Sequence, residues 1–337
     1  MAQYRILIVR LGSMGDILHA LPAAALLRRT WPEGVVEWAV HPKWSDLFEG
    51  NPLQIQPIYL DRKSASSRRE AFARLRSERY DFVIDFQGLI QSAIVSRVAK
   101  RKTVYGFHRS LLRERPAAWF YSHTVNTSSA HVVDRNIALV VAAGAQAGPV
   151  EFPLPEGRPE GELPERFVLA APLAGWTSKQ WPLENYAPLV RWLKTEFGLA
   201  LVLNGAPGAE AVLRSVDGAW VHTSGIAGLI DATRRATAVV GLDSGPMHLA
   251  AALGKAGVAL FGPTDPARNG PYGGSLTVLR DASAKTTYQR GTVIDPALRA
   301  LTPGVVAAAL SRCLQQSERG RKGAPQVQSC APGEPLP

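Results

Sequence analysis

The 337-residue chain has little cysteine, and its two cysteines, Cys313 and Cys330, lie near the C-terminus. So few cysteines exclude a disulfide framework and a cysteine-ligated zinc site, and they fit a reducing compartment. The sequence also lacks a run of about 18 uncharged apolar residues. Its first residues, MAQYRILIVRLGSMGD, contain no apolar stretch of signal-peptide length. These absences predict a chain that is neither secreted nor membrane-spanning.

The composition is that of an ordinary folded protein. Hydrophobic residues make up 46% of the chain and charged residues 20%, which excludes a disordered chain. A length of 337 residues exceeds what one hydrophobic core usually serves. We therefore expect two domains.

Positive charge is unevenly distributed along the chain. The net charge is +10, and residues 1–150 hold 20 basic and 12 acidic side chains, a balance of +8. Residues 62–79 have seven basic side chains against two acidic ones, and residues 97–115 have seven against one. This excess predicts an anionic partner for the first half of the chain, namely a phosphorylated lipid, a nucleic acid or a polyanionic sugar. Charge alone also fits a solvated helix face.

Short β-branched runs alternate with amphipathic stretches, which predicts an α/β fold of two doubly wound, parallel-sheet domains. We expect strands at 5–10, 35–40, 55–60, 81–86, 167–172, 199–205, 236–243 and 257–263. We expect helices at about 16–29, 68–79 and 89–99. The stretch 152–166, rich in Pro, Gly and Glu, predicts a linker between domains 1–151 and 167–316. The polar tail 317–337 is expected to be disordered.

The first strand ends in RLGSMGDILHALP, where Gly12 and Gly15 allow a tight turn before Asp16. Ligands of such sheets bind beyond the carboxyl ends of the strands, so Asp16 is expected to face the crevice between the domains. An N-terminal helix cap explains the same aspartate equally simply. The glycine spacing is not GxGxxG, which argues against a dehydrogenase.

The second domain carries the denser pattern, VVGLDSGPMHLAAALG at 239–254. The expected strand ends at Asp243, and the turn of Ser244, Gly245 and Pro246 opens a helix. Exposed amides and a hydroxyl at a helix N-terminus predict a diphosphate site. His248, in the first turn, is placed to donate to the same anion, although a lone histidine there is also compatible with a purely structural role.

A lysine lies in the loop GWTSKQWP (175–182), after the expected strand 167–172. Lys179 at such a turn can neutralise a departing phosphate. An ordinary surface lysine is the alternative.

Several segments together resemble a known family, in the order ILIVRLGSMGDILHALPA, DFVIDFQGLIQSA, a Lys before WP, NGAP, LDSGPMHLAAALG and FGPTDP. The chain is similar to the lipopolysaccharide heptosyltransferases, over roughly residues 4–315. Within the family it most resembles the heptosyltransferase I members, which add the first heptose to the Kdo of the inner core.

The resemblance implies the GT-B architecture, two facing Rossmann-like domains with the acceptor bound by the first and the nucleotide-sugar by the second. It implies an inverting transfer from ADP-heptose without a cofactor or metal, and no DxD metal motif occurs in the sequence. The implied partner is Kdo-lipid A, and no nucleic acid is implied. The protein itself is expected to be cytoplasmic and bound peripherally to the cytoplasmic face of the inner membrane. This partner agrees with the positive first domain.

The resemblance also assigns residues. Asp16 matches the catalytic base. The donor-binding positions are Lys179, Asp243, Ser244, Gly245, His248 and Glu210. The expected acceptor-binding positions are Ser13, Gly15, Arg62, Lys63, Gln87 and Arg113. For Gln87, a plain strand-end turn fits as well as substrate contact.

The chain departs from the family pattern at several donor-side positions. Ala174 and Gly175 replace paired hydroxyl residues, with Thr177 and Ser178 displaced, and Ala209 and Ser224 replace an acidic residue and a methionine. Glu210 is adjacent to Ala209 and can take over contacts to ribose. These departures concern the specificity for the sugar and the nucleoside of the donor. A transferase of the same family that uses another donor sugar, or that acts on a later core acceptor, therefore stays an alternative. A non-catalytic nucleotide-sugar-binding module is the rival of a different class.

Overall fold

The first half of the chain folds around a parallel β-sheet. The structure, a computed structural model, describes residues 4–323. The first six strands hydrogen-bond in the order β3-β2-β1-β4-β5-β6, and every neighbouring pair is parallel. Ile6 of the central strand pairs with Val36 on one side and Phe82 on the other. The strands are β1 (Arg5–Val9), β2 (Val35–Val40), β3 (Gln56–Tyr59), β4 (Arg79–Asp85), β5 (Lys100–Phe107) and β6 (His123–Val125).

Helices cover both faces of this sheet, since α2 packs against α5 and α3 against α4. The single helix predicted at 16–29 is two helices in the structure. Pro22 lies in the first turn of the second helix, where its missing N–H is not needed, so a new helix starts there. The helices are α1 (Met14–Leu18), α2 (Leu21–Thr30), α3 (Ala65–Ser77), α4 (Ile90–Val98) and α5 (Val132–Ala142), with 3-10 turns η1 (Pro42–Leu47) and η2 (Arg115–Phe120).

The second half repeats the topology of the first. Its sheet has the order β12-β11-β10-β7-β8-β9 and is also parallel throughout. When the strands of each sheet are numbered along the chain, both sheets have the Rossmann order 3-2-1-4-5-6. The strands are β7 (Phe167–Ala170), β8 (Ala200–Gly205), β9 (Trp220–Thr223), β10 (Ala238–Leu242), β11 (Gly257–Phe261) and β12 (Leu276–Arg280).

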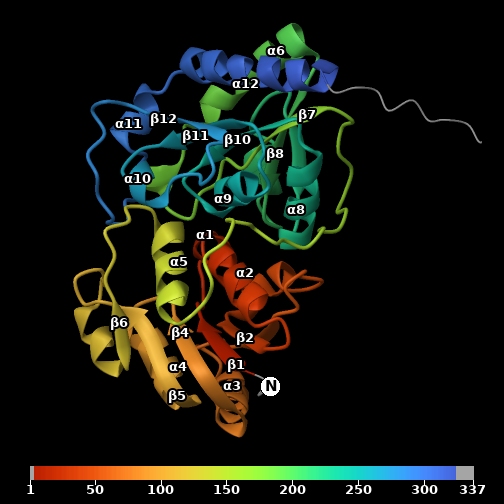
Figure 1. Cartoon of the computed structure of the whole chain (residues 1–337). Coiled ribbons are helices and arrows are strands. Elements are labelled where there is room, and N and C mark those ends of the chain that lie inside the picture. The colour runs from red at the N-terminus through yellow and green to blue at the C-terminus, as the bar shows by residue number, and fades with distance from the viewer. Residues whose placement is uncertain (1–3, 324–337) are drawn as a thin grey trace, which may run out of the picture.

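The helices of the second half also flank their sheet, α6 with α12 and α8 with α9 (Figure 1). They are α6 (Tyr186–Phe197), α7 (Glu210–Leu213), α8 (Ile226–Arg235), α9 (Gly245–Ala252), α10 (Pro266–Asn269), α11 (Pro296–Ala300) and α12 (Pro303–Gly323), with 3-10 turns η3 (Thr177–Lys179) and η4 (Leu183–Asn185). Helix α12 continues beyond residue 316, so disorder starting at residue 317 is wrong for 317–323. The rest of the predicted tail lies outside the described residues.

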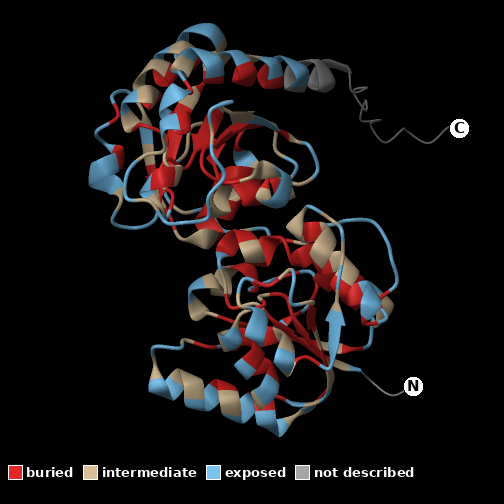
Figure 2. Ribbon diagram, turned by 90° about the vertical axis from the view of Figure 1, so that its left-hand side faces the viewer, coloured by how far each residue is buried: buried red, intermediate tan, exposed pale blue. Residues whose placement is uncertain are grey.

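The central strands of both sheets are buried because helices cover them, as Figure 2 shows. The largest fully buried side chains include Trp38 on β2 and Trp181 after η3. Each apolar residue withdrawn from water contributes about 1.5–3 kcal/mol. The strand order of the two parallel sheets confirms the predicted α/β class with two facing Rossmann-like domains.

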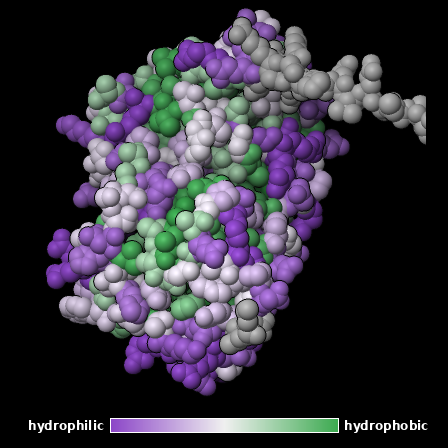
Figure 3. Space-filling view, in the orientation of Figure 1, coloured by the Kyte–Doolittle hydropathy of each residue, from purple (hydrophilic) through white to green (hydrophobic). Residues whose placement is uncertain are grey.

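The two domains meet where α1 lies against α9 (Figure 1). Glycines allow this close approach. A β-carbon on Gly15 would lie 2.5 Å from Cδ2 of His248, and one on Gly245 would lie 2.8 Å from Sδ of Met14. Met247 of α9 belongs to an apolar cluster that includes residues of both domains. In the space-filling view, hydrophobic side chains gather near the middle of the face, at the level of this junction (Figure 3).

The segment predicted as a linker is fixed at several points. The side chain of Asn51 donates to the carbonyl of Pro153. The guanidinium of Arg234 donates to the carbonyls of Leu154 and Pro155. The connecting segment therefore follows the surface of both domains, although its composition indicated only a linker.

Candidate active site

Both sheets direct the carboxyl ends of their strands toward the domain junction, and a cavity of about 230 Å³ lies there. It gathers most of the predicted donor-side residues at one place. Its walls are Ser13, Gly15, Asp16 and His19 from the first domain, and Trp176, Lys179, Asp243, Ser244, Gly245, His248, Thr264, Asn269 and Tyr288 from the second.

The N-terminus of α9 opens into this donor-side cavity. Strand β10 ends at Leu242, Ser244 is the N-cap, and the helix begins at Gly245, two residues earlier than the sequence suggested. Pro246 occupies the first turn, where no intrahelical N–H bond is lost. The partial positive charge of this end favours an anion.

Asp243 holds Lys179 in place and lies beside His248. Its Oδ2 accepts a hydrogen bond from Nζ of Lys179 at 2.5 Å and another from the hydroxyl of Thr264. Its Oδ1 lies 3.6 Å from Nε2 of His248. Burial raises the pKa of Asp243, but His248 and Lys179 outweigh it, so the pKa lies well below its usual range. The aspartate is thus ionised and positions Lys179, which also lies 4.5 Å above the ring of Trp176.

Three histidines from both domains meet beside this cavity. Nε2 of His19 lies 3.1 Å from Nδ1 of His248, and the ring of His19 also contacts that of His131, with centroids 5.5 Å apart. Burial, followed by the nearby His248, lowers the pKa of His19 well below its usual range. His19 is therefore neutral at pH 7.

Asp16 lies in the first turn of α1 and is oriented from two sides. Its Oδ2 accepts hydrogen bonds from the backbone N–H and the hydroxyl of Ser13, at 3.0 and 2.9 Å. Its Oδ1 pairs with the guanidinium of Arg10. Burial raises the pKa of Asp16, but Arg10 and Ser13 outweigh it and hold the pKa below its usual range. The carboxylate is ionised at neutral pH, and its side chain is still 31% exposed.

A second cavity, of about 220 Å³, adjoins the first on the side of the first domain. We call it the acceptor-side cavity. Asp16 and Asn269 line both cavities. Its other walls are Arg10, Gly12, Phe86, Gln87, Gly88, Leu89, Phe107, Leu111, Leu112, Arg113, Val132, Arg135 and Arg268.

The turn after β4 presents Gln87 to this cavity. The carboxylate of Asp85 is buried and accepts hydrogen bonds from the backbone N–H groups of Gln87 and Gly88. It also accepts the hydroxyl of Tyr121, at 2.8 Å. Gly88 has a φ of +67°, which favours glycine. The amide oxygen of Gln87 accepts the N–H of Leu11 at 2.8 Å and so ties this turn to the end of β1.

The structure brings some predicted residues together and leaves others apart. Ser13 and Gly15, expected on the acceptor side, line the donor-side cavity, whereas Gln87 and Arg113 line the acceptor-side one. Arg62, Lys63 and Glu210 line neither cavity. The first two are exposed beyond β3.

Glu210 lies on α7, beyond the carboxyl end of β8. Its carboxylate binds Arg214 of the same helix, at 2.5 Å. Ser224, which replaces a methionine of the family pattern, is buried and accepts the amide of Asn204 at 2.9 Å.

The sequence did not single out five of the residues that line the donor-side cavity, namely His19, Trp176, Thr264, Asn269 and Tyr288. Thr264 stands in FGPTDP, one of the segments that carried the family resemblance. His19 stands in ILIVRLGSMGDILHALPA, and Trp176 stands in the loop GWTSKQWP beside Lys179. Asn269 and Tyr288 belong to no motif, since only the folded chain brings them to the cavity.

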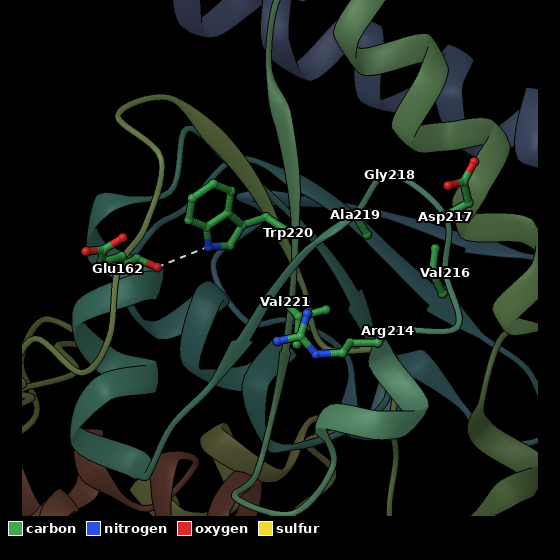
Figure 4. Close-up of a pocket in the computed structure, with 8 residues that line it drawn as sticks. All are labelled: Glu162, Arg214, Val216, Asp217, Gly218, Ala219, Trp220 and Val221. Atoms are coloured by element: carbon green, nitrogen blue, oxygen red, sulfur yellow. Dashed lines mark hydrogen bonds between the residues drawn. The ribbon is translucent and has the colours of Figure 1, made fainter.

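A separate hollow of about 630 Å³ lies at the amino end of β9. Its walls are Glu162, Arg214, Val216, Asp217, Gly218, Ala219, Trp220 and Val221 (Figure 4), and Trp220 donates to the carbonyl of Glu162 at 3.1 Å. Ligands of doubly wound sheets bind at the carboxyl ends of strands, so this hollow is at the wrong end of its sheet for the reaction.

Within residues 4–323, no group of three or more His, Cys, Asp or Glu side chains is arranged to hold a metal ion. In the same part of the chain, no helix combines the length and apolarity that a membrane crossing requires.

Two facing Rossmann-like domains, with a cavity at their junction that a helix N-terminus and a carboxylate line, are the architecture of a glycosyltransferase of the GT-B type. The comparisons with known proteins narrow this class. The profile of glycosyltransferase family 9 (heptosyltransferase) matches residues 68–297. The chain belongs to this family and is a heptosyltransferase.

Individual relatives agree with this assignment. The chain is 30% identical to lipopolysaccharide heptosyltransferase 1 of Pseudomonas aeruginosa, over 82% of this chain and 83% of the relative. It is 28% identical to lipopolysaccharide heptosyltransferase 1 of Escherichia coli (strain K12), over 82% of this chain and 93% of the relative. Its structure is similar to that of the E. coli heptosyltransferase WaaC with ADP, with a TM-score of 0.74, 25% identity, and coverage of 93% of this chain and 99% of that one. The resemblance to heptosyltransferases of type I is therefore confirmed.

Proposed function

We propose that this heptosyltransferase moves the heptose of ADP-heptose to the Kdo of the lipopolysaccharide inner core, with inversion at the anomeric carbon. The similarity to lipopolysaccharide heptosyltransferase 1 relatives and to a structure with ADP supports the donor and the acceptor. The observation that carries the mechanism is the position of Asp16 in the wall shared by the two cavities.

The donor-side cavity is suited to a nucleoside diphosphate. Lys179, His248 and the amides at the N-terminus of α9 converge on one space. Fixed positive groups stabilise the charge that develops on a departing diphosphate. We propose that they do so without a bound metal ion, and that ADP leaves with the electron pair of the broken bond between the anomeric carbon and the phosphate oxygen.

Asp16 acts on the other side of the anomeric carbon. Its carboxylate accepts the proton of the acceptor hydroxyl while that oxygen forms the new bond to the anomeric carbon. One displacement with the nucleophile and ADP on opposite faces inverts the configuration. The pKa of Asp16, below its usual range, makes it a weak base that is ionised at neutral pH, so its contribution comes from position.

The test is Asp16→Ala in the full-length chain, assayed with ADP-heptose and Kdo-lipid A in the presence of EDTA, with the product analysed by mass. We expect kcat to fall by about 10²–10⁴-fold, the usual contribution of positioned proton transfer. ADP binding, measured by calorimetry, should persist because the diphosphate contacts lie in the second domain. Undiminished turnover would contradict the assignment of Asp16. Equal transfer from a UDP- or GDP-sugar would contradict that of the donor.

We also propose that the enzyme contacts the cytoplasmic face of an anionic membrane peripherally through α4 and η2. These elements pack together and expose Ile90, Ile94 and Trp119, the last with 85% of its surface accessible. A hollow beside Trp119 is lined by Arg97, Arg101 and Lys102. An amphipathic tryptophan among cations fits the headgroup region of an anionic bilayer. The same end of the domain carries Arg113 of the acceptor-side cavity.

Sedimentation with vesicles that contain phosphatidylglycerol tests this contact. Trp119→Ala should bind such vesicles several-fold more weakly, because an exposed aromatic anchor is lost, while transfer to a soluble Kdo acceptor stays at the wild-type rate. Trp220→Ala, at an exposed tryptophan of the second domain, is the matched control. Equal sedimentation of Trp119→Ala and wild type would contradict the proposal.

A further inference from the structure

Two arginines from opposite domains share the acceptor-side cavity. Arg135 lies in the first turns of α5 in the first domain, and Arg268 lies on α10 in the second. Both line this cavity. The pattern of the sequence gave neither of them a role, because they stand far apart in the chain and outside every motif.

Contacts between α5 and the segment around α10 hold together the two parts of the chain that carry these arginines. Nε2 of His131 donates to the carbonyl of Gly270 at 3.1 Å, and Nδ1 of the same ring accepts the N–H of Val133, which is consistent with one neutral tautomer. The hydroxyl of Tyr272 donates to Oδ1 of Asp134 at 2.7 Å. The rings of His131 and Tyr272 also touch, with centroids 4.9 Å apart.

No carboxylate of the described residues forms an ion pair with either arginine. The Nε of Arg135 donates to the carbonyl of Ser129, and the guanidinium of Arg268 lies 5.0 Å above the ring of Tyr288. Burial, followed by the charge of Arg268, lowers the pKa of Arg135. Two like charges face each other here, which is unfavourable unless an anion lies between them.

The remaining charges of the cavity do not supply that anion. Asp16 is the one carboxylate among the described residues that line it, and Arg10 already pairs with Asp16. Arg113 adds a further exposed cation. The cavity is therefore strongly cationic, whereas the substrate that enters it, on the proposed function, is an acidic sugar.

We propose that Arg135 and Arg268 together bind one anionic group of the acceptor, a carboxylate or a phosphate, and so form an acceptor subsite built by both domains. The inference rests on the proposed function, because the acceptor must occupy this cavity. Guanidinium groups suit this ligand, since each can donate two parallel hydrogen bonds to a carboxylate or phosphate. The second domain then recognises the acceptor as well as the donor, and the subsite exists only while the domains are in contact.

The test uses steady-state kinetics of the full-length enzyme with ADP-heptose and Kdo-lipid A. Arg268→Gln and Arg135→Gln should each raise the KM for the acceptor by about tenfold to a hundredfold, the usual effect of losing a hydrogen bond to a charged group. The KM for ADP-heptose should stay within about twofold of wild type, because neither arginine lines the donor-side cavity. Arg299→Gln, at an exposed arginine of α11 that lines neither cavity, is the control and should change neither value.

Modified acceptors identify the anion. A dephosphorylated acceptor and one with esterified Kdo carboxylates are each compared with the parent in wild type and Arg268→Gln. The modification that removes the bound group should raise the KM in wild type and have little further effect in the variant. An unchanged acceptor KM in both arginine variants, or equal effects on donor and acceptor, would overturn the subsite. Absence of heptose transfer by the wild type would instead overturn the proposed function.

Discussion

Asp16 shows how one residue serves structure and chemistry at once. The sequence left two interpretations, a helix cap and a catalytic base. In the structure Ser13 is the N-cap, and Asp16, in the first turn, accepts the N–H of Ser13. The same hydrogen bond fixes the carboxylate in the wall shared by the two cavities. The structural role therefore supplies the orientation that the proposed chemical role requires.

Arg10 sets the acidity of this carboxylate, which leads to a pH prediction. Because the Arg10 guanidinium helps to hold the pKa of Asp16 below its usual range, Arg10→Gln should raise that pKa. Asp16 then protonates at a higher pH than in wild type, so the acid limb of the kcat/KM profile should move to higher pH. Activity should recover toward neutral pH. Profiles of Arg10→Gln and of the control Arg299→Gln, recorded from pH 4 to 8, check this shift, and coincident acid limbs would contradict it.

The residues that the sequence identified share one property. Asp16, Lys179 and Asp243 all follow a strand directly or within one loop, so the order of strands and helices alone brings them to one edge of each sheet. Arg62 and Glu210 also follow strands, but loop and helix conformation directs them away from the cavities. Trp176 lies in the same loop as Lys179 and contacts it, whereas Arg268 reaches the acceptor-side cavity only because the two domains pack together, which no local pattern encodes.

At the scale of elements, the contact between α1 and α9 is the central one. Both helices begin with a glycine-containing turn, and these glycines lie against the opposite helix. The sequence assigned them to backbone approach to a ligand. In the structure they also allow the helices themselves to meet, which brings Asp16, the proposed base, close to the N-terminus of α9, the proposed diphosphate site.

Gly15→Ala tests this contact. The new β-carbon would lie 2.5 Å from Cδ2 of His248, and His248 is held by Asp243 and His19. Overpacking of this kind costs about 1–3 kcal/mol. We expect a lower Tm and a lower kcat/KM for ADP-heptose.

Gly304→Ala in α12 is the matched control, since its β-carbon would have no neighbour closer than 3.9 Å. Wild-type values of both Tm and kcat/KM for Gly15→Ala would contradict a tight contact between the helices.

The sequence missed four strands, β5, β6, β9 and β12, and all of them lie at or next to the edge of a sheet. Strand β5, KRKTVYGF, begins with basic residues and is half exposed along its first half. Strands β6 and β9 have only three and four residues. Sheet edges tolerate such sequences because only part of each strand is covered, and these strands take their conformation from the pairing partner.

At the scale of the whole molecule, the net charge of +10 belongs mostly to the first domain. The structure places part of this charge at the acceptor-side cavity, through Arg10, Arg113 and Arg135. The donor-side cavity contains Lys179, whose charge Asp243 already compensates. The two substrates should therefore depend differently on ionic strength.

Salt should weaken acceptor binding more than donor binding. The screening length falls from about 10 Å at 0.1 M salt to about 3 Å at 1 M, which reduces the attraction between exposed arginines and an acidic acceptor. Raising NaCl across this range should increase the KM for the acceptor several-fold and change that for ADP-heptose less. A parallel rise of the two constants would contradict the division of charge between the domains.

Within residues 4–323, the chain passes between the two domains once, since α12 packs against α6 and β11 of the second domain. The passage lies on the side of η1 and α8, where Asp46 accepts the N–H of Ala227 at 3.1 Å, and α5 and α10 lie on the other side of α1 and α9 (Figure 1). The covalent connection between the domains thus lies at one side of their contact, and the opposite side is joined only by non-covalent contacts. A rotation of one domain relative to the other that keeps the contacts of this passage would separate the domains most at α5 and α10. On the proposed function, a bulky lipid-linked sugar would then enter on the side of Arg135 and Arg268, the two arginines of the proposed acceptor subsite.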